Sequence, residues 1–339
     1  MIDTSLQQSE PVAVSQEPQG RQTRTIAGYS LLMALMILLG LPVFVPAVVL
    51  YCGIRFGSRS AAVTLFAAAV LSMVSVMMGG QAQDMRFAHS FAAGSVLALG
   101  VPAIAAIPLV RRGESFGRVL IVLLAAGALG MVITELLFRA VAGYSVYAVH
   151  AAQARESVKM LVGAYQANGM AAAAMRMERV GSYFSSTLVA GWMLTNLVTS
   201  FVLSLLMFGR LPAGRELAAR VAPGATGTYQ LRNLSLPDGV LFLFVLGGLA
   251  PLVTGLAHTI AANVLLLAVF LYIVQGFALL RFLLASLGVG FIGALLASLF
   301  IFLTGIGPLL LGLAGLFDPF FDFRHFKKRK DDSHESHSD

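Results

Sequence analysis

The feature that most limits the fold of this chain is a series of long apolar stretches with no charge near their centres. About 20 apolar residues in a helix cross a hydrocarbon layer of about 30 Å. Only 12% of the 339 residues are charged, whereas soluble domains carry about 25%, so lipid must solvate much of the surface. We therefore predict an all-α fold, a polytopic transmembrane helical bundle of eight to ten segments. The stretches cover about residues 26–54, 60–83, 89–110, 117–139, 185–209, 239–257, 259–280 and 284–317.

Two of these stretches, 26–54 and 284–317, are longer than one crossing needs and contain helix-breaking residues near the middle. Leu41–Pro46 holds two prolines, and Gly305–Pro308 combines glycine with proline. Proline removes a helical hydrogen bond and clashes with the preceding turn. If each stretch is a hairpin of two short helices the chain has ten segments, and if each is one helix it has eight.

Lysine and arginine indicate the orientation, because cytoplasmic loops of membrane proteins carry an excess of both. With both long stretches as hairpins and the N-terminus in the cytoplasm, 17 of the 23 Lys and Arg residues fall on the cytoplasmic side. We predict a multi-pass protein of a bacterial inner (plasma) membrane with both termini cytoplasmic. Membrane lipid is the expected partner. Nucleic acid is not, because the basic residues lie between apolar stretches and at the C-terminus.

The longest segment outside the apolar stretches, 143–184, has the pattern of an amphipathic helical hairpin. Val158, Leu161, Val162 and Tyr165 recur at helical spacing. Asn168–Gly169 then favours a helix end, because both residues tolerate a left-handed backbone. The orientation places this hairpin outside the cytoplasm.

The chain therefore divides into five parts. Within the fourth part, residues 223–238 are rich in Gly and Pro and fit either a short β-hairpin or an extended lead-in to the next helix. The parts are a disordered cytoplasmic leader (1–25), an N-terminal transmembrane bundle (26–142), an extracytoplasmic amphipathic helical hairpin (143–184), a C-terminal transmembrane bundle (185–318) and a basic, then acidic, cytoplasmic tail (319–339).

Three amides inside the apolar stretches are candidate ligand-binding residues: Asn196, Asn263 and Gln275. Intramembrane amides commonly join helices through hydrogen bonds, so helix contacts are the alternative. Asn263 and Gln275 are twelve residues apart, which places them within about 120° around one helix. A shared polar interior that includes Asn196 is therefore compatible with the sequence.

Glu135 is a fourth candidate, because a charged side chain within a membrane segment needs a reason. Arg139 lies one turn later, and the two fit an i, i+4 ion pair at the membrane interface. The alternative is that Glu135 faces a ligand or carries a proton. His258 begins another apolar segment and fits a membrane boundary, with a pH-sensing or ligand role as the alternative.

Several kinds of chemistry lack their motifs in this sequence. There is no Gly-x-x-x-x-Gly-Lys-Ser/Thr loop for nucleotide phosphates, no His-Glu-x-x-His and no Gly-x-Ser-x-Gly. Cys52 is the single cysteine, so neither a disulfide nor a cysteine metal site can form within the chain. We expect no enzymatic activity, no bound metal and no cofactor.

The order of features resembles that of the YybS-like family of uncharacterised bacterial membrane proteins, whose sequences share domain of unknown function 2232. The resemblance covers nearly all of residues 26–326. Its early helices are in turn similar to the vitamin-binding S components of energy-coupling factor transporters. The residues that carry the resemblance are Pro42–Pro46, Tyr51–Gly57, Ala154–Asn168, Leu236–Asp238, Asn263, Tyr272–Gly276, Gly315–Asp318 and Phe321–Arg324.

The resemblance and the intramembrane amides together favour a membrane protein that binds or transports a small molecule. Because the chain lacks a nucleotide-binding loop, energised transport would need a partner ATPase or coupling subunit. The alternative is a scaffold or interaction protein of the cell envelope, suggested by the amphipathic hairpin and the basic loops.

Overall fold

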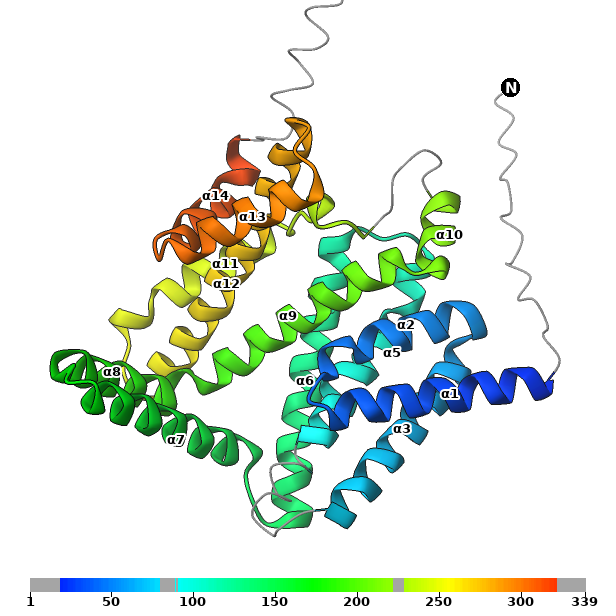
Figure 1. Cartoon of the computed structure of the whole chain (residues 1–339), viewed down its shortest axis with the longest axis horizontal. Coiled ribbons are helices and arrows are strands. Elements are labelled where there is room, and N and C mark those ends of the chain that lie inside the picture. Colours follow the sequence, from blue (N-terminus) through cyan, green and yellow to red (C-terminus); the bar gives the residue numbers. More distant parts are fainter. Residues whose placement is uncertain (1–18, 80–88, 90, 222–228, 322–339) are drawn as a thin grey trace, which may run out of the picture.

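A computed structural model describes residues 19–79, 89, 91–221 and 229–321, and most of these are helical, with no strand among them (Figure 1). The predicted all-α fold is confirmed. Residues 1–18 of the predicted leader and 322–339 of the predicted tail lie outside the described residues. The leader prediction is wrong for residues 19–25, because the first helix, α1, begins at Gln19. Gln and Arg have good helix propensity, so the helix extends beyond the apolar stretch at its polar end.

The break predicted in stretch 26–54 is confirmed. Helix α1 (Gln19–Leu38) ends before Gly40, whose φ of 71° is left-handed, and the 3-10 helix η1 (Pro42–Phe44) leads into α2 (Val45–Phe56). Helix α3 (Ser58–Gly79) packs against both α1 and α2. The prolines begin the second helix, where a missing N–H is tolerated.

The next helices form the centre of the first half. The π-helix η2 (Ser95–Gly100) runs directly into α5 (Val101–Arg111), and a short turn leads to α6 (Phe116–Ala142). Helix α6 starts with Ser115, whose hydroxyl accepts a hydrogen bond from the Arg118 N–H. It then packs against α5 and η2 on one side and against the later helix α9 on another.

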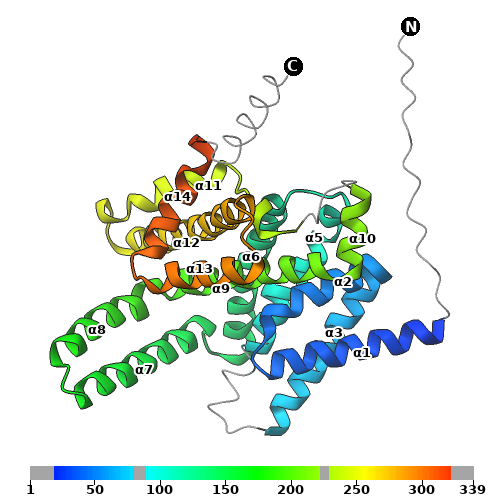
Figure 2. The ribbon, with the colours of Figure 1, turned by 45° about the horizontal axis from the view of Figure 1, so that its top comes forward.

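Helices α7 (Val146–Ala167) and α8 (Ala171–Tyr183) pack against one another and project from the rest of the molecule (Figure 2). As predicted, Asn168 caps α7 and Gly169 turns with a φ of 72°. Helix α8 continues through the π-helix η3 (Phe184–Leu188) into α9 (Val189–Arg210). The predicted division at 184/185 therefore falls inside one continuous helix of 40 residues, Ala171–Arg210. The extracytoplasmic location of the hairpin stays a prediction.

The last part of the chain packs around one long helix, α12 (Gly255–Ser286). The predicted break at Gly305–Pro308 is confirmed, because α13 and α14 are bent by 110° there. Of the segment 223–238, residues 222–228 lie outside the described part, and 229–238 form a short 3-10 turn and an extended lead-in without strand pairing. The other elements are α10 (Pro212–Val221), η4 (Leu231–Asn233), α11 (Gly239–Gly248), η5 (Ala250–Leu252), α13 (Phe291–Leu303) and α14 (Gly307–Phe321).

Within the described residues, five helices are long and apolar enough to cross a membrane, or six if the bent α13–α14 pair is one span. Three shorter apolar helices (Thr23–Leu38, Pro42–Phe56 and Gly239–Leu252) account for other predicted segments. Large apolar side chains on the outside, such as Phe66 (72% exposed) and Leu129 (60% exposed), identify the lipid-facing surface. The protein thus has several candidate membrane spans, and its two broken stretches consist of short helices.

Candidate functional site

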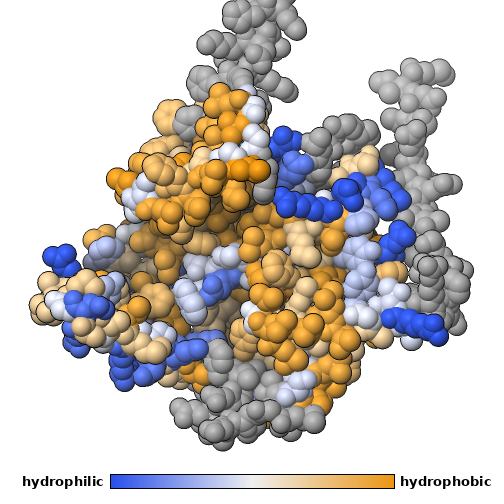
Figure 3. Space-filling model, in the orientation of Figure 1, coloured by the Kyte–Doolittle hydropathy of each residue, from blue (hydrophilic) through white to orange (hydrophobic). Residues whose placement is uncertain are grey.

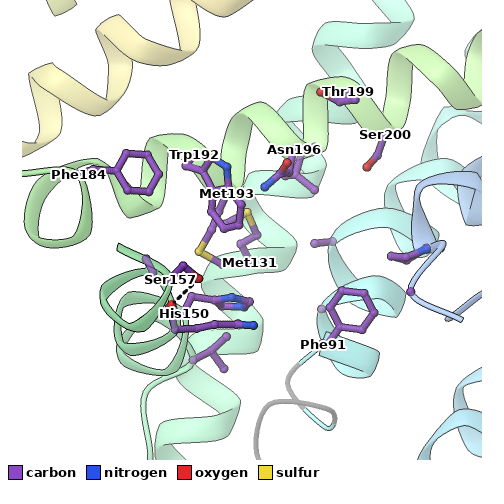
Figure 4. Close-up of a pocket in the computed structure, with 18 of the residues that line it drawn as sticks. Phe91, Met131, His150, Ser157, Phe184, Trp192, Met193, Asn196, Thr199 and Ser200 are labelled. Atoms are coloured by element: carbon purple, nitrogen blue, oxygen red, sulfur yellow. Dashed lines mark hydrogen bonds between the residues drawn. The ribbon is translucent and has the colours of Figure 1, made fainter. Parts of the chain in front are cut away.

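A cavity of about 900 Å³ lies between the α7–α8 hairpin and the first half of the bundle (Figure 4). Figure 3 shows the surface hollowed between the hairpin and the apolar body. Six parts of the chain line the cavity: the α1–η1 turn, the segment through η2, α6, α7, the α8–η3 helix and α9. The hairpin therefore forms one wall, and the bundle forms the others.

The wall of the cavity, as far as the described residues form it, is largely apolar and carries no formal charge. None of the described residues that line it is Asp, Glu, Lys or Arg. In Figure 4, Trp192, Met193 and Asn196 of α9 face His150 and Ser157 of α7 across the opening. Such a wall suits an uncharged molecule, because transferring a charge from water into an apolar space is costly unless a partner is present.

Two π-helices form part of this wall. Ser95, Ala98 and Leu99 of η2 and Phe184 of η3 all line the cavity. A π-turn is rare within α-helices and is frequently found at functional sites. Both irregular turns of this kind in the described part of the chain therefore border the same space.

Close backbone packing supports η2 from behind. A Cβ added to Gly130 of α6 would lie 2.2 Å from the Leu97 carbonyl oxygen, closer than any side chain allows. Glycine at this position lets α6 pack directly against the π-helix. The wall at η2 is therefore fixed by contact between two backbones.

Among the described residues that line the cavity, His150 is the titratable side chain. Burial lowers the pKa of its imidazole below the ordinary value of 6.5, because a low-dielectric surrounding disfavours the charged form. His150 is therefore neutral at neutral pH, and its ring both donates and accepts hydrogen bonds. The lining includes Gln153 and Asn196 as further polar groups.

Among the predicted site residues, Asn196 lines the cavity and is exposed to it. Asn263 does not. It is 7% exposed and joins α12 to the helix at η3: its amide nitrogen donates to the carbonyl oxygens of Thr187 (2.7 Å) and Thr259 (2.6 Å), and its oxygen accepts from the Gly191 N–H. Because a π-turn interrupts the regular hydrogen-bond pattern, this amide completes the bonding of backbone groups at its end.

Gln275 lies in a different contact, on the far end of α12. It is fully buried, accepts from the Leu236 N–H (3.2 Å) and donates to the Asp318 carboxylate (3.3 Å). Gly276 and Gly315 let α12 and α14 meet there, since a Cβ on either would lie about 2 Å from a backbone oxygen of the other helix. Three of the sequence features that carry the family resemblance therefore meet at one point.

Glu135 joins α6 to the start of the hairpin. Its carboxylate pairs with Arg139 and accepts a hydrogen bond from the Tyr147 N–H (2.9 Å) in the first turn of α7. The predicted ion pair is present within α6, and the hydrogen bond from Tyr147 joins the hairpin to α6, next to Thr134 of the cavity lining. His258 similarly links α12 to Tyr183 (3.1 Å) and to the Ala250 carbonyl (2.9 Å).

The four predicted site residues thus do not share one interior. Asn196 reaches the cavity, Glu135 lies at its edge, and Asn263 and Gln275 serve separate helix contacts. The sequence analysis missed His150, Trp192 and Asp318. Trp192 could have been found from the sequence, because it is the single tryptophan and belongs to the same apolar segment as Asn196. Within the described residues, no three His, Cys, Asp or Glu side chains lie close enough together to hold a metal ion.

The fold and the cavity define an α-helical membrane protein with several candidate spans and with a cavity, uncharged over its described residues, beside a surface hairpin. Comparison with known families agrees: residues 26–319 match the model of a family described as predicted membrane protein (DUF2232). The chain belongs to that family, as the resemblance implied. Neither the curated proteins nor the solved structures gave a significant match.

Proposed function

We propose that this protein binds a small, uncharged and mainly apolar molecule in the cavity beside the hairpin. The observation that supports this most is a space of about 900 Å³ with no charged side chain among the described residues of its lining. Ligand sites are commonly apolar clefts of about 300–1,000 Å³ with a few polar groups that orient the ligand. Asn196, His150 and Gln153 supply those polar groups.

We further propose that the binding step belongs to transport across a bacterial inner membrane with both termini cytoplasmic. The sequence has no nucleotide-binding loop, so energised transport would depend on a partner ATPase or coupling subunit, as in S components. The proposal includes no catalytic step.

The position of Trp192 gives a direct binding assay. It is the single tryptophan and it lines the cavity, so its fluorescence reports occupancy without a label. The protein in nanodiscs would be titrated with ten-carbon probes that differ only in the head group: decanol and decanamide as neutral probes, decanoate and decylamine as charged ones. We expect a saturable change at lower concentrations of the neutral probes.

Two glycine variants make the assay specific for the cavity. Gly94 lines it, and a Cβ added there meets nothing within 4 Å, so Gly94→Leu should project into the space and weaken the saturable change. Gly163 on α7 also has open space around it but lies outside the lining, so Gly163→Leu should bind as the unmodified protein does. Equal responses to all four probes, or an unchanged response in Gly94→Leu, would refute the proposal.

A scaffold role is the second candidate, because the hairpin also exposes apolar side chains. Met160 (65%), Met175 (67%) and Val180 (66%) are exposed on α7 and α8, and such surface can bind another protein or lipid. Crosslinking from the hairpin in membranes separates the two. A stable protein neighbour whose crosslinking yield does not change when the neutral probes are added favours the scaffold role.

A further inference from the structure

Arginine side chains gather at one end of the bundle, at three neighbouring helix junctions. The junctions are α2–α3 (residues 51–59), α5–α6 (109–118) and α9–α10 (208–221). The acidic residues in the same segments are only Glu114 and Glu216, and the segments contain no lysine. The eight residues, called the arginine surface here, are Arg55, Arg59, Arg111, Arg112, Arg118, Arg210, Arg215 and Arg220.

Contacts between the junctions show that they form one surface. Arg111 donates to the Gly53 carbonyl oxygen (2.7 Å) at the end of α2, and Arg55 lies 3.7 Å from Glu216 of α10. Tyr229 donates to the Glu114 carbonyl oxygen (3.4 Å) and packs its ring between Phe116 and Phe208, which ties α6 to α9. Figure 3 shows hydrophilic side chains gathered over α10 and the adjoining helix ends.

The arginine surface lies where lipid-facing helix surface ends. Phe66 of α3 is 72% exposed and comes two turns after Arg59; Leu203 of α9 is 40% exposed and comes two turns before Arg210. Apolar side chains at that distance place the guanidinium groups close to headgroup depth. All eight arginine residues are exposed, and even the ion-paired Arg118 has 72% of its side chain exposed.

We propose that the arginine surface binds the phosphate groups of anionic phospholipids in the leaflet at this end of the protein. The depth of the surface favours this partner, because it brings the guanidinium groups to the lipid phosphates. Guanidinium is planar and binds phosphate through two parallel hydrogen bonds, which ammonium cannot do. Carboxylates of an acidic protein pair with guanidinium in the same way, so depth is the feature that distinguishes the two partners.

The test compares lipid retention by the purified protein in nanodiscs of phosphatidylcholine mixed with phosphatidylglycerol. Native mass spectrometry after detergent release counts the retained molecules of each lipid. We expect at least about a fivefold preference for phosphatidylglycerol, since each arginine near an anionic surface adds to the attraction. Arg59→Gln, Arg112→Gln and Arg220→Gln combined should lower that preference to near parity. Arg55 and Arg111, which make structural contacts, stay unchanged.

A second triple variant controls for loss of charge alone. Arg155→Gln, Arg176→Gln and Arg179→Gln remove the same charge from exposed positions on the hairpin and should leave the preference intact. Inorganic phosphate, added at the concentration of the lipid phosphate, should not displace phosphatidylglycerol. The proposal is overturned if the two lipids are retained equally, if the two triple variants behave alike, or if free phosphate displaces the lipid. Because the neutral-probe assay reads the cavity, either proposal can fail without the other.

Discussion

Replacing Asn263 by Leu should destabilise the protein strongly, although the two side chains have similar size. The change removes the acceptor of the Gly191 N–H and the donor to the Thr187 carbonyl oxygen. The third partner, the Thr259 carbonyl oxygen, lies one turn earlier on α12 itself and is within reach of its regular helical bond. A buried N–H and a partly buried carbonyl oxygen are therefore left without their partner.

The size of the effect follows from those two groups. A buried polar group without a partner costs about 1–3 kcal/mol, and interhelical hydrogen bonds in membranes average about 0.6 kcal/mol. Two bonds at about 1 kcal/mol each give an expected loss of about 2 kcal/mol in the free energy of unfolding. Equilibrium unfolding in mixed micelles of increasing dodecyl sulfate content, followed by Trp192 fluorescence, measures this loss.

Asn196→Leu is the matched control, because it makes the same chemical change at an amide that faces the cavity. Its free energy of unfolding should change by less than about 0.5 kcal/mol. If Asn263→Leu and Asn196→Leu had equal stability, the assigned role of Asn263 as the amide that joins α12 to η3 would be refuted.

Three further predictions concern the helix crossing, the cavity and pH. Gly276→Ala places a Cβ 1.9 Å from the Leu311 carbonyl oxygen and should cost about 3 kcal/mol of stability in the same unfolding assay. Gly248→Ala, whose added Cβ meets nothing within 4 Å, should cost almost nothing. Equal losses of stability in the two variants would contradict the close α12–α14 crossing. Asn196→Leu should weaken decanamide binding about fivefold in the Trp192 titration, the effect of one hydrogen bond of about 1 kcal/mol, and an unchanged affinity would exclude Asn196 from the site. Because burial lowers the pKa of His150 below 6.5, the folded state favours the neutral imidazole. The contribution of His150 to the free energy of unfolding should be complete above pH 6.5 and decline as pH falls from 6.5 through the lower folded-state pKa. His150→Gln should flatten this decline in unfolding measured between about pH 8 and pH 5.

The parts of the fold that sequence analysis predicted correctly depend on local backbone chemistry. Pro42 and Pro46, Asn168–Gly169 and Gly305–Pro308 each end or begin a helix for reasons contained in a few residues. The number of long helices was harder to predict, because hydropathy identifies apolar stretches without fixing the length of each helix. Helices α13 and α14, with 13 and 15 residues, show this difference.

The cavity could not be predicted, because it depends on which helices meet. The π-turns at Ser95–Gly100 and Phe184–Leu188 have no short sequence signal, and both form part of its wall. The angular spacing of Asn263 and Gln275 was compatible with a shared interior, but the two amides form hydrogen bonds with different neighbours of α12. His150 was missed because the hairpin was interpreted as a surface element, and its packing against the bundle is a long-range property.

The continuous helix Ala171–Arg210 has a mechanical consequence. Forty residues at 1.5 Å each make a rod of about 60 Å, longer than the roughly 40–45 Å that a bilayer measures with its headgroups. One end of this rod belongs to the hairpin, its middle lines the cavity, and its other end carries Arg210 beside α10. The Asn263 amide holds this helix in place near the cavity. The hairpin and the end of the protein beside α10 are therefore joined by one continuous helix, with no loop between them.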